Sequence, residues 1–190
     1  YGLQVEQGTR LYHLVDKGAI SLPDESTEDT MYDMMMQGIQ DLGFERYEIS
    51  NFAKDKAYSK HNLKYWQYCD YLGFGAGAHS FFDGVRRANN RNVMPYARKI
   101  DCFEFPVVEE EHIDAKRSRE DYCFLSLRTK WGINTVDFAN RFNIRLEDIY
   151  GSILDNLIEK NLIIQDGDLY YLTPEGAKHG NYVFSQFIKE

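Results

Sequence analysis

The spacing of hydrophobic residues changes along the first fifty positions, from strand-like alternation to helical periodicity and back. Alternation over 1–5 predicts a strand, and apolar residues about 3.6 positions apart predict helices over 11–15 and 27–42. A second strand is expected over 47–50. We interpret this succession as a βαβ unit, in which the strands are parallel neighbours and functional groups lie at their carboxyl ends.

Methionines are concentrated on the second of these helices, which is expected to begin after a cap at Ser26 or Thr27. They occupy positions 31, 34, 35 and 36. This helical spacing is typical of core packing, and we predict that role rather than a metal or cofactor site.

The middle of the chain alternates between glycine-rich, apolar and acidic segments. Residues 71–80 read as an extended strand, and 86–92 are expected to pair with it after a turn at 83–84. A short helix is expected over 95–100. Pro106 and three consecutive glutamates make 104–114 typical of a solvated linker.

The last third of the chain has the periodicity of three helices followed by a hairpin. The predicted elements are helices over 117–128, 135–142 and 145–160, strands over 162–164 and 169–172, and a final helix from 174 toward 188. This order predicts a winged helix. We therefore expect two domains, an α/β part over 1–112 and an α+β part over 113–190, with further elements of the first part before Tyr1.

Composition and charge narrow the class of protein. With 43% hydrophobic residues the chain can bury a core, and no run approaches the ~20 apolar residues that cross a bilayer. The net charge of −8, and the 9 basic against 11 acidic residues of 117–190, disfavour nucleic-acid binding by the predicted winged helix. Cys69, Cys102 and Cys123 are too widely spaced for a cluster motif, and we interpret them as reduced core thiols of a cytoplasmic protein.

Three glycines in the predicted strand are spaced two apart, at Gly73, Gly75 and Gly77. On a strand they would leave one face bare, so that a flat ligand, another backbone or a packed helix could approach closely. The spacing is not the dinucleotide-binding fingerprint. His79 follows this segment and could point into a cavity or into the core.

The densest cluster of candidate functional residues is His61-Asn62-Leu63-Lys64-Tyr65-Trp66. On a helix His61 and Tyr65 share one face and Asn62 and Trp66 the next. An imidazole can ligate haem iron and aromatic rings can stack on a porphyrin. A packed, hydrogen-bonded corner is the alternative interpretation of the same residues.

Three motifs in fixed order make a specific resemblance. They are Tyr47-Glu48-Ile49-Ser50-Asn51-Phe52-Ala53, His61-Asn62-x-x-Tyr65-Trp66 and Asp70-Tyr71-Leu72-Gly73-Phe74-Gly75-Ala76-Gly77-Ala78-His79-Ser80. Together they resemble the oxygen-independent coproporphyrinogen III oxidase-like family of radical S-adenosylmethionine proteins (HemN/HemW), and within it the haem chaperone branch. Glu6-Gln7-Gly8-Thr9 resembles the family's E-P-G-T segment, with Gln7 in place of proline.

The resemblance implies a partial radical-SAM-type (β/α) barrel followed by the winged helix. It also implies an upstream Cys-x-x-x-Cys-x-x-Cys that holds a 4Fe–4S cluster with S-adenosylmethionine. Since this chain contains no such motif, we expect it to bind neither group and to be catalytically inactive. No catalytic residue can be assigned from the sequence.

Carried over position by position, the resemblance implies that His61, Asn62, Tyr65 and Trp66 bind haem, with His61 facing the iron. It makes Asn51, Gly73, Gly75, Gly77 and His79 candidates for the cofactor or substrate cavity. The expected partners are a tetrapyrrole, haem or coproporphyrinogen, and a haem-acceptor protein. A haem chaperone is the first functional interpretation, the oxidase the second, and a nucleic-acid-binding winged helix the third.

Overall fold

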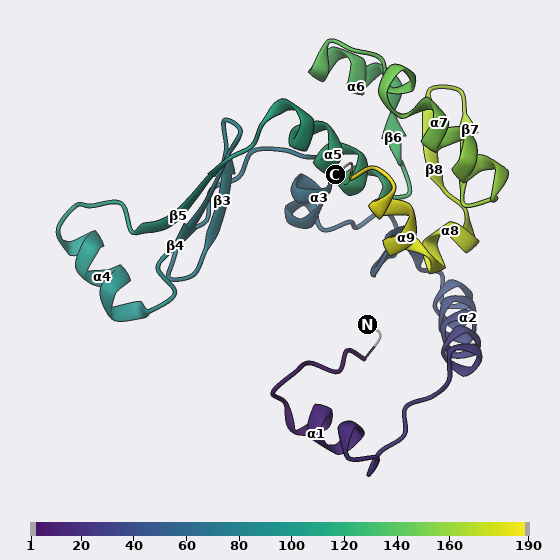
Figure 1. Ribbon diagram of the computed structural model, residues 1–190, viewed down its shortest axis with the longest axis horizontal. Coiled ribbons are helices and arrows are strands. Elements are labelled where there is room, and N and C mark those ends of the chain that lie inside the picture. The colour runs from purple at the N-terminus through teal and green to yellow at the C-terminus, as the bar shows by residue number, and fades with distance from the viewer. Residues whose placement is uncertain (1–2, 189–190) are drawn as a thin grey trace. The chain divides into compact units, whose positions relative to one another are not determined.

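A computed structural model describes residues 3–188 of the chain, which divides into two compact units, 1–57 and 58–190. In the first unit two helices precede a small hairpin (Figure 1). The elements are α1 (Arg10–Asp16), α2 (Glu25–Asp41), β1 (Glu45–Glu48) and β2 (Asn51–Ala53). Both helices were predicted, and Asp24 rather than Ser26 or Thr27 caps α2, because its carboxylate accepts the Thr27 N–H at 2.8 Å.

The predicted βαβ unit is wrong in the described residues. Residues 3–5 form no strand, and the rest of that prediction, 1–2, lies outside the described residues. β1 instead pairs antiparallel with β2, and Glu48 lies opposite Asn51 across a two-residue turn. The Glu48 carboxylate stabilises the turn by accepting hydrogen bonds from the Ser50 N–H at 2.7 Å and the Asn51 amide at 2.6 Å.

The methionine face of α2 is not packed in a core among the described residues. Met31, Met34 and Met35 are 57, 71 and 40% exposed. A hydrogen bond of 2.7 Å from Arg46 to the Tyr32 hydroxyl joins β1 to the helix.

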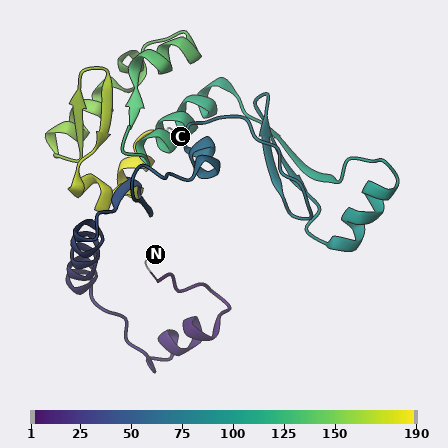
Figure 2. The same cartoon turned by 180° about the vertical axis from the view of Figure 1, so that it is seen from behind.

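The second unit begins with α3 (Lys60–Trp66) and continues into a three-stranded antiparallel sheet with one helix at its end (Figures 1 and 2). We call residues 71–112 the sheet arm. Its elements are β3 (His79–Phe82), β4 (Val85–Asn89), α4 (Val93–Asp101) and β5 (Val107–His112), with strand order β3-β4-β5. The predicted turn at Asp83-Gly84 is confirmed, with both residues at positive φ.

Two predictions for the sheet arm are wrong. Residues 72–78 form a loop rather than a strand, because Gly75 and Gly77 have φ of +113° and +72°, and β3 begins only at His79. The expected linker contains β5, in which Glu110 and Glu111 lie opposite Arg87 and Arg86 of β4. Arg87 and Glu110 form an ion pair at 2.8 Å, so strand pairing brings positive charge to part of the acidic run.

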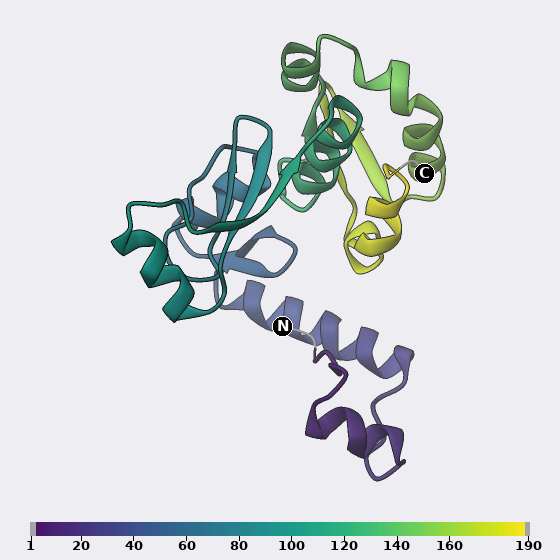
Figure 3. The same ribbon diagram turned by 60° about the vertical axis from the view of Figure 1, so that its left-hand side comes forward.

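Residues 115–187 of the second unit are called the C-terminal module. Its elements are α5 (Ala115–Leu127), β6 (Ile133–Asn134), α6 (Thr135–Phe142), α7 (Leu146–Glu159), β7 (Ile163–Asp166), β8 (Leu169–Leu172), α8 (Pro174–Lys178) and α9 (Gly180–Ser185). The strands form a sheet of order β6-β8-β7 (Figure 1), and Figure 3 shows the same ribbon turned by 60°. Three predicted helices and the hairpin are confirmed. The predicted final helix is instead two short helices that meet at His179.

The main hydrophobic core lies in the C-terminal module. Helices α5, α6, α7 and α9 and strands β6 and β7 contribute to a set of side chains with at most 1% exposure, which Phe187 completes: Cys123, Leu127, Ile133, Phe138, Leu146, Leu154, Leu157, Ile163, Val183 and Phe187. No helix within residues 3–188 has the length and hydrophobicity of a membrane span. The predicted boundary at 112/113 stays a prediction.

Candidate functional site

The short helix α3 carries the densest group of candidate residues. Ser59 begins it by accepting the Asn62 N–H at 3.3 Å. His61 and Tyr65 are one turn apart, and the His61 Nε2 and the Tyr65 hydroxyl are joined by a hydrogen bond of 2.7 Å. Their rings meet edge to face with centroids 5.0 Å apart. The predicted contact between imidazole and phenol is confirmed, and His61 remains exposed.

Tyr71 connects this face of α3 to the sheet arm. Its ring meets that of Tyr65 edge to face at 4.6 Å, and its backbone pairs with Phe81 through bonds of 2.7 and 2.9 Å. Burial, followed by the nearby Tyr65, raises the pKa of Tyr71. The Tyr71 phenol is therefore a neutral stacking group at neutral pH.

Trp66 lies on the other predicted face of α3 and contacts the C-terminal module. The guanidinium of Arg128 lies 4.5 Å from the centre of the indole ring. Asn62 is half-buried on the same face. The four residues of the motif are therefore divided, because His61 and Tyr65 pair with each other while Trp66 packs on α5.

The glycine loop is shaped by contacts with its own backbone. A side chain at Gly73 would place Cβ 2.1 Å from the His79 carbonyl oxygen, so close backbone approach requires glycine there. The Asn89 amide donates to the carbonyl of Gly75 at 3.0 Å, and the Gly75 N–H donates to the Tyr96 hydroxyl at 3.1 Å. The sequence left a flat ligand, another backbone or a packed helix as the group that approaches these glycines, and at Gly73 it is another backbone segment.

The two remaining candidates lie in different units. His79 is exposed at the start of β3, opposite Ala88. Asn51 belongs to the first unit, where its amide donates to Glu48. The structure thus joins His61, Tyr65 and, through Tyr71, the glycine loop; a haem-binding role for any of these residues stays a prediction.

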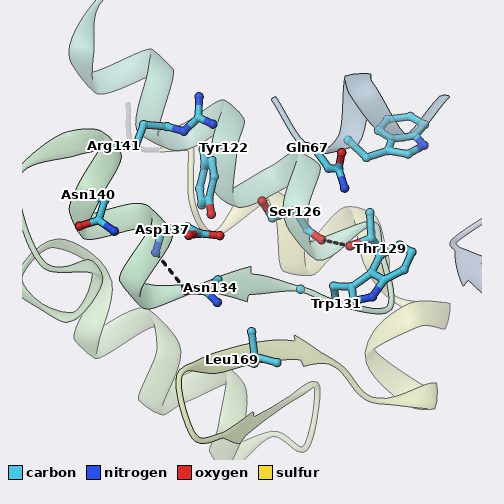
Figure 4. Close-up of a pocket in the computed structure, with 12 residues that line it drawn as sticks. Gln67, Tyr122, Ser126, Thr129, Trp131, Asn134, Asp137, Asn140, Arg141 and Leu169 are labelled. Carbon is cyan, nitrogen blue, oxygen red and sulfur yellow. Dashed lines mark hydrogen bonds between the residues drawn. The ribbon is translucent and has the colours of Figure 1, made fainter. Parts of the chain in front are cut away.

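A cleft of about 850 Å³ lies where α3 meets the C-terminal module (Figure 4). Its wall is mostly polar and aromatic: Trp66, Gln67, Tyr122, Ser126, Thr129, Trp131, Gly132, Asn134, Asp137, Asn140, Arg141 and Leu169. Burial and the neighbouring Asp137 raise the pKa of Tyr122. Of the residues predicted for the site, Trp66 alone lines this cleft. Among the other lining residues, the sequence pattern indicated a role for Asn134 only as a possible cap, and it caps α6.

The cysteines differ in environment. Cys123 is buried, Cys69 half-buried and Cys102 exposed, so the prediction of core thiols is right for Cys123 and wrong for Cys102. Burial, with Glu120 as a second cause, raises the pKa of Cys123 well above that of a free thiol. Within 3–188 no three His, Cys, Asp or Glu residues are grouped so as to hold a metal ion.

Comparison with known proteins finds relatives among the HemN and HemW proteins. Residues 119–177 match the family model described as the HemN C-terminal domain. The chain is 38% identical to haem chaperone HemW of Bacillus subtilis over its whole length and 50% of that protein. It is 32% identical to haem chaperone HemW of Lactococcus lactis, covering 99% of this chain and 49% of the relative.

Structural comparison agrees at the level of the fold. Coproporphyrinogen III oxidase (HemN) from Escherichia coli, a radical SAM enzyme, aligns with a TM-score of 0.69 at 14% identity, over 87% of this chain and 42% of that one. The chain spans about half the length of the curated relatives it matches. The predicted mixed α/β character is confirmed, and no closed barrel is formed by residues 3–188.

Proposed function

Because this chain belongs to the oxygen-independent coproporphyrinogen III oxidase-like (HemN/HemW) family, we propose that it is the haem-handling part of a haem chaperone that delivers haem to an acceptor protein. The observation that carries the proposal is the exposed His61 of α3, whose ring is oriented by Tyr65. The names of the 38% and 32% identical relatives favour a chaperone over an oxidase.

His61 is the proposed iron ligand. A neutral imidazole has one N–H and one lone pair, and the hydrogen bond to Tyr65 at Nε2 influences which nitrogen holds each. When the phenol oxygen accepts a hydrogen bond from the Nε2–H group, the lone pair of the imidazole is on Nδ1 and can ligate iron. In that case Tyr65 orients the imidazole ring, while Asn62 and the glycine loop complete the proposed surroundings of the haem.

Haem titration of the 190-residue chain tests the role of His61. We expect His61→Ala to weaken haem binding at least about tenfold and to change the Soret band, since an axial ligand is lost. His112→Ala is the matched control, because His112 is 78% exposed on β5 and should leave both readouts unchanged. Equal haem affinity and spectrum for His61→Ala and the unsubstituted chain would refute the assignment.

The 4Fe–4S cluster and S-adenosylmethionine of the radical SAM family do not fit the cysteines of this chain. One thiol is buried with a raised pKa, another is exposed, and no grouped ligand set occurs within the described residues. We propose that both groups belong to a part of the protein outside this chain. Coproporphyrinogen decarboxylation by a longer protein containing it, without haem transfer, would favour the oxidase alternative.

We also infer that residues 115–172 form a winged helix in a cytoplasmic protein. The order helix, strand, two helices and hairpin, with sheet order β6-β8-β7, supports this proposal. The first turn of α7 contains Glu147 and Asp148, which repel phosphate. A protein-docking or capping role is therefore favoured, and a salt-sensitive shift of the chain on duplex DNA would contradict it.

A further inference from the structure

Helix α3 is too short to fix the position of His61 by itself. It has seven residues and no buried side chain. Isolated helices shorter than about 12–15 residues are marginal in water, so contacts with other elements must hold α3 in place. Those contacts decide how the imidazole is presented.

The carboxyl end of α3 is anchored by Arg128 of the segment that ends α5. The Arg128 guanidinium lies 4.5 Å from the Trp66 ring centre and 5.9 Å from those of Phe124 and Phe184. Phe124 and Phe184 themselves meet edge to face at 5.2 Å. Three rings thus surround one cation, and only Trp66 comes from outside the C-terminal module.

The chain just beyond α3 has two further anchors in the same module. The Tyr68 hydroxyl lies 3.0 Å from the Ser118 hydroxyl of α5. Arg141 of α6 donates to the Tyr68 carbonyl at 3.3 Å and stacks over its ring at 5.6 Å. Tyr68 is buried, so this segment is held firmly.

The amino end of α3 is anchored by Lys130, the third cation in these contacts. Lys130 donates to the Tyr58 hydroxyl at 2.7 Å and lies 4.8 Å from the centre of its ring. Trp131 completes this contact, with its ring 5.4 Å from that of Tyr58. Tyr58 immediately precedes the cap residue Ser59, so Lys130 fixes the place where the helix begins.

We propose that Arg128 and Lys130 are positioning residues for haem binding, which hold α3 at its two ends through Trp66 and Tyr58. The haem part of this inference rests on the proposed function. In this arrangement Trp66 contributes through the packing of α3 on the C-terminal module rather than by stacking on a porphyrin. Arg128 and Lys130 act without contacting the tetrapyrrole.

Amide hydrogen exchange of the whole chain tests the anchoring without haem. We expect Arg128→Gln and Lys130→Met each to accelerate exchange in 61–66 at least about tenfold, while exchange in α7 stays unchanged. Arg128→Lys should fall between, because it keeps the charge and loses the planar stacking group. Unchanged exchange in α3, or an equal increase in α7, would overturn the inference.

A matched control is available within the module. Lys160 donates to the Tyr182 hydroxyl and lies 5.1 Å from its ring centre, the same arrangement as Lys130 and Tyr58, but neither residue belongs to α3 or to the residues that flank it. Lys160→Met should leave exchange in 61–66 within about twofold of the unsubstituted chain. Acceleration there equal to that of Lys130→Met would show a general loss of stability and refute the positioning role.

Haem titration of the same variants completes the test. Arg128→Gln should weaken affinity about three- to tenfold while the Soret band keeps its position, since the iron ligand is retained. Trp66→Phe combined with Arg128→Gln should weaken binding no more than the stronger single change. Faster exchange in α3 with unchanged haem affinity would overturn the positioning role. If the unsubstituted chain binds no haem, the proposed function is refuted. The exchange experiment then decides whether Arg128 and Lys130 anchor α3.

Discussion

The C-terminal module and the sheet arm belong to the same unit but are stabilised differently. In the module, aliphatic and aromatic side chains are buried from all sides, with Leu127, Phe138 and Leu157 fully inaccessible. In the sheet arm, Phe103 and Phe105 are 99 and 89% exposed. Burial of apolar area contributes most of the free energy of folding, so the module can hold the rest of the unit while the arm depends on local pairing.

The difference explains where a functional helix is anchored. All three anchors of α3 described above, at Tyr58, Trp66 and Tyr68, lead to the C-terminal module. The sheet arm contacts α3 through the ring of Tyr71, and the ring of Phe81 lies 4.9 Å from that of Tyr68 just beyond the helix. A rigid module presents the proposed haem ligand, and the more exposed arm completes its surroundings.

The largest expected difference between the two regions is in the rate at which their cysteine thiols are labelled. Cys102 is exposed at the end of α4 in the arm, whereas Cys123 is fully buried in the module with a raised pKa. We expect Cys123 to react with an alkylating reagent at least about a thousandfold more slowly, because labelling requires opening of the module. Mass spectrometry of labelled peptides over time measures both rates.

The pH dependence of Cys123 follows from the direction of its shift. Because the folded pKa lies above the unfolded one, the thiol contributes stability that is complete below about pH 9 and is lost as the pH rises further. The labelling rate of Cys123 should therefore rise above that pH, because the module that buries the thiol loses stability there. Similar rates for the two thiols at neutral pH would contradict the contrast between module and arm.

The next largest expected difference is in the contribution that one phenylalanine of each region makes to the free energy of unfolding. The ring of Phe138 packs against those of Phe142, Tyr122 and Tyr150 at 4.8, 5.8 and 6.3 Å. Phe138→Ala should lower the free energy of unfolding by about 3–5 kcal/mol, through lost burial and a cavity. Denaturant unfolding followed by circular dichroism measures the change.

The matching substitution in the arm is Phe103→Ala. Since Phe103 is 99% exposed, its removal should change the free energy of unfolding by less than about 0.5 kcal/mol. A loss comparable with that of Phe138→Ala would mean that Phe103 is buried in solution, and the comparison of the two regions would fail.

The sequence predicted the module better than the arm for the same physical reason. A buried face imposes helical periodicity, and the predicted helix over 145–160 corresponds to α7 at 146–159. In the arm the signals are not local. The glutamates of 109–111 are typical of a linker until strand pairing places Arg87 and Arg86 of β4 opposite Glu110 and Glu111. Glycines two positions apart are typical of a strand, although here they form a loop.

The candidate site was predictable to the extent that it is local. The spacing of His61 and Tyr65 predicts their contact, which the hydrogen bond of 2.7 Å confirms. The contact of Trp66 with Arg128 could not be predicted, because it depends on the packing of α3 against α5, which are distant in sequence. The antiparallel pairing of β1 with β2 was missed because a turn of Ile49 and Ser50 lacks glycine and proline.

The smallest expected effect concerns the ion pairs of the sheet arm. Arg87 and Glu110 are 2.8 Å apart with 32 and 45% of their side chains exposed, so their pair should contribute about 0.2–1 kcal/mol. Glu110→Gln should accelerate amide exchange of β4 and β5 modestly at low salt, and the difference should fade near 1 M salt as charges are screened. Glu109→Gln is the control, since Glu109 lies opposite Ala88 and should have little effect at either salt concentration. An effect of Glu110→Gln that persisted undiminished in high salt would contradict the role of charge. Hydrogen bonding or packing would then hold β5 in the sheet, and the arm would resemble the module more closely than its exposed surface indicates.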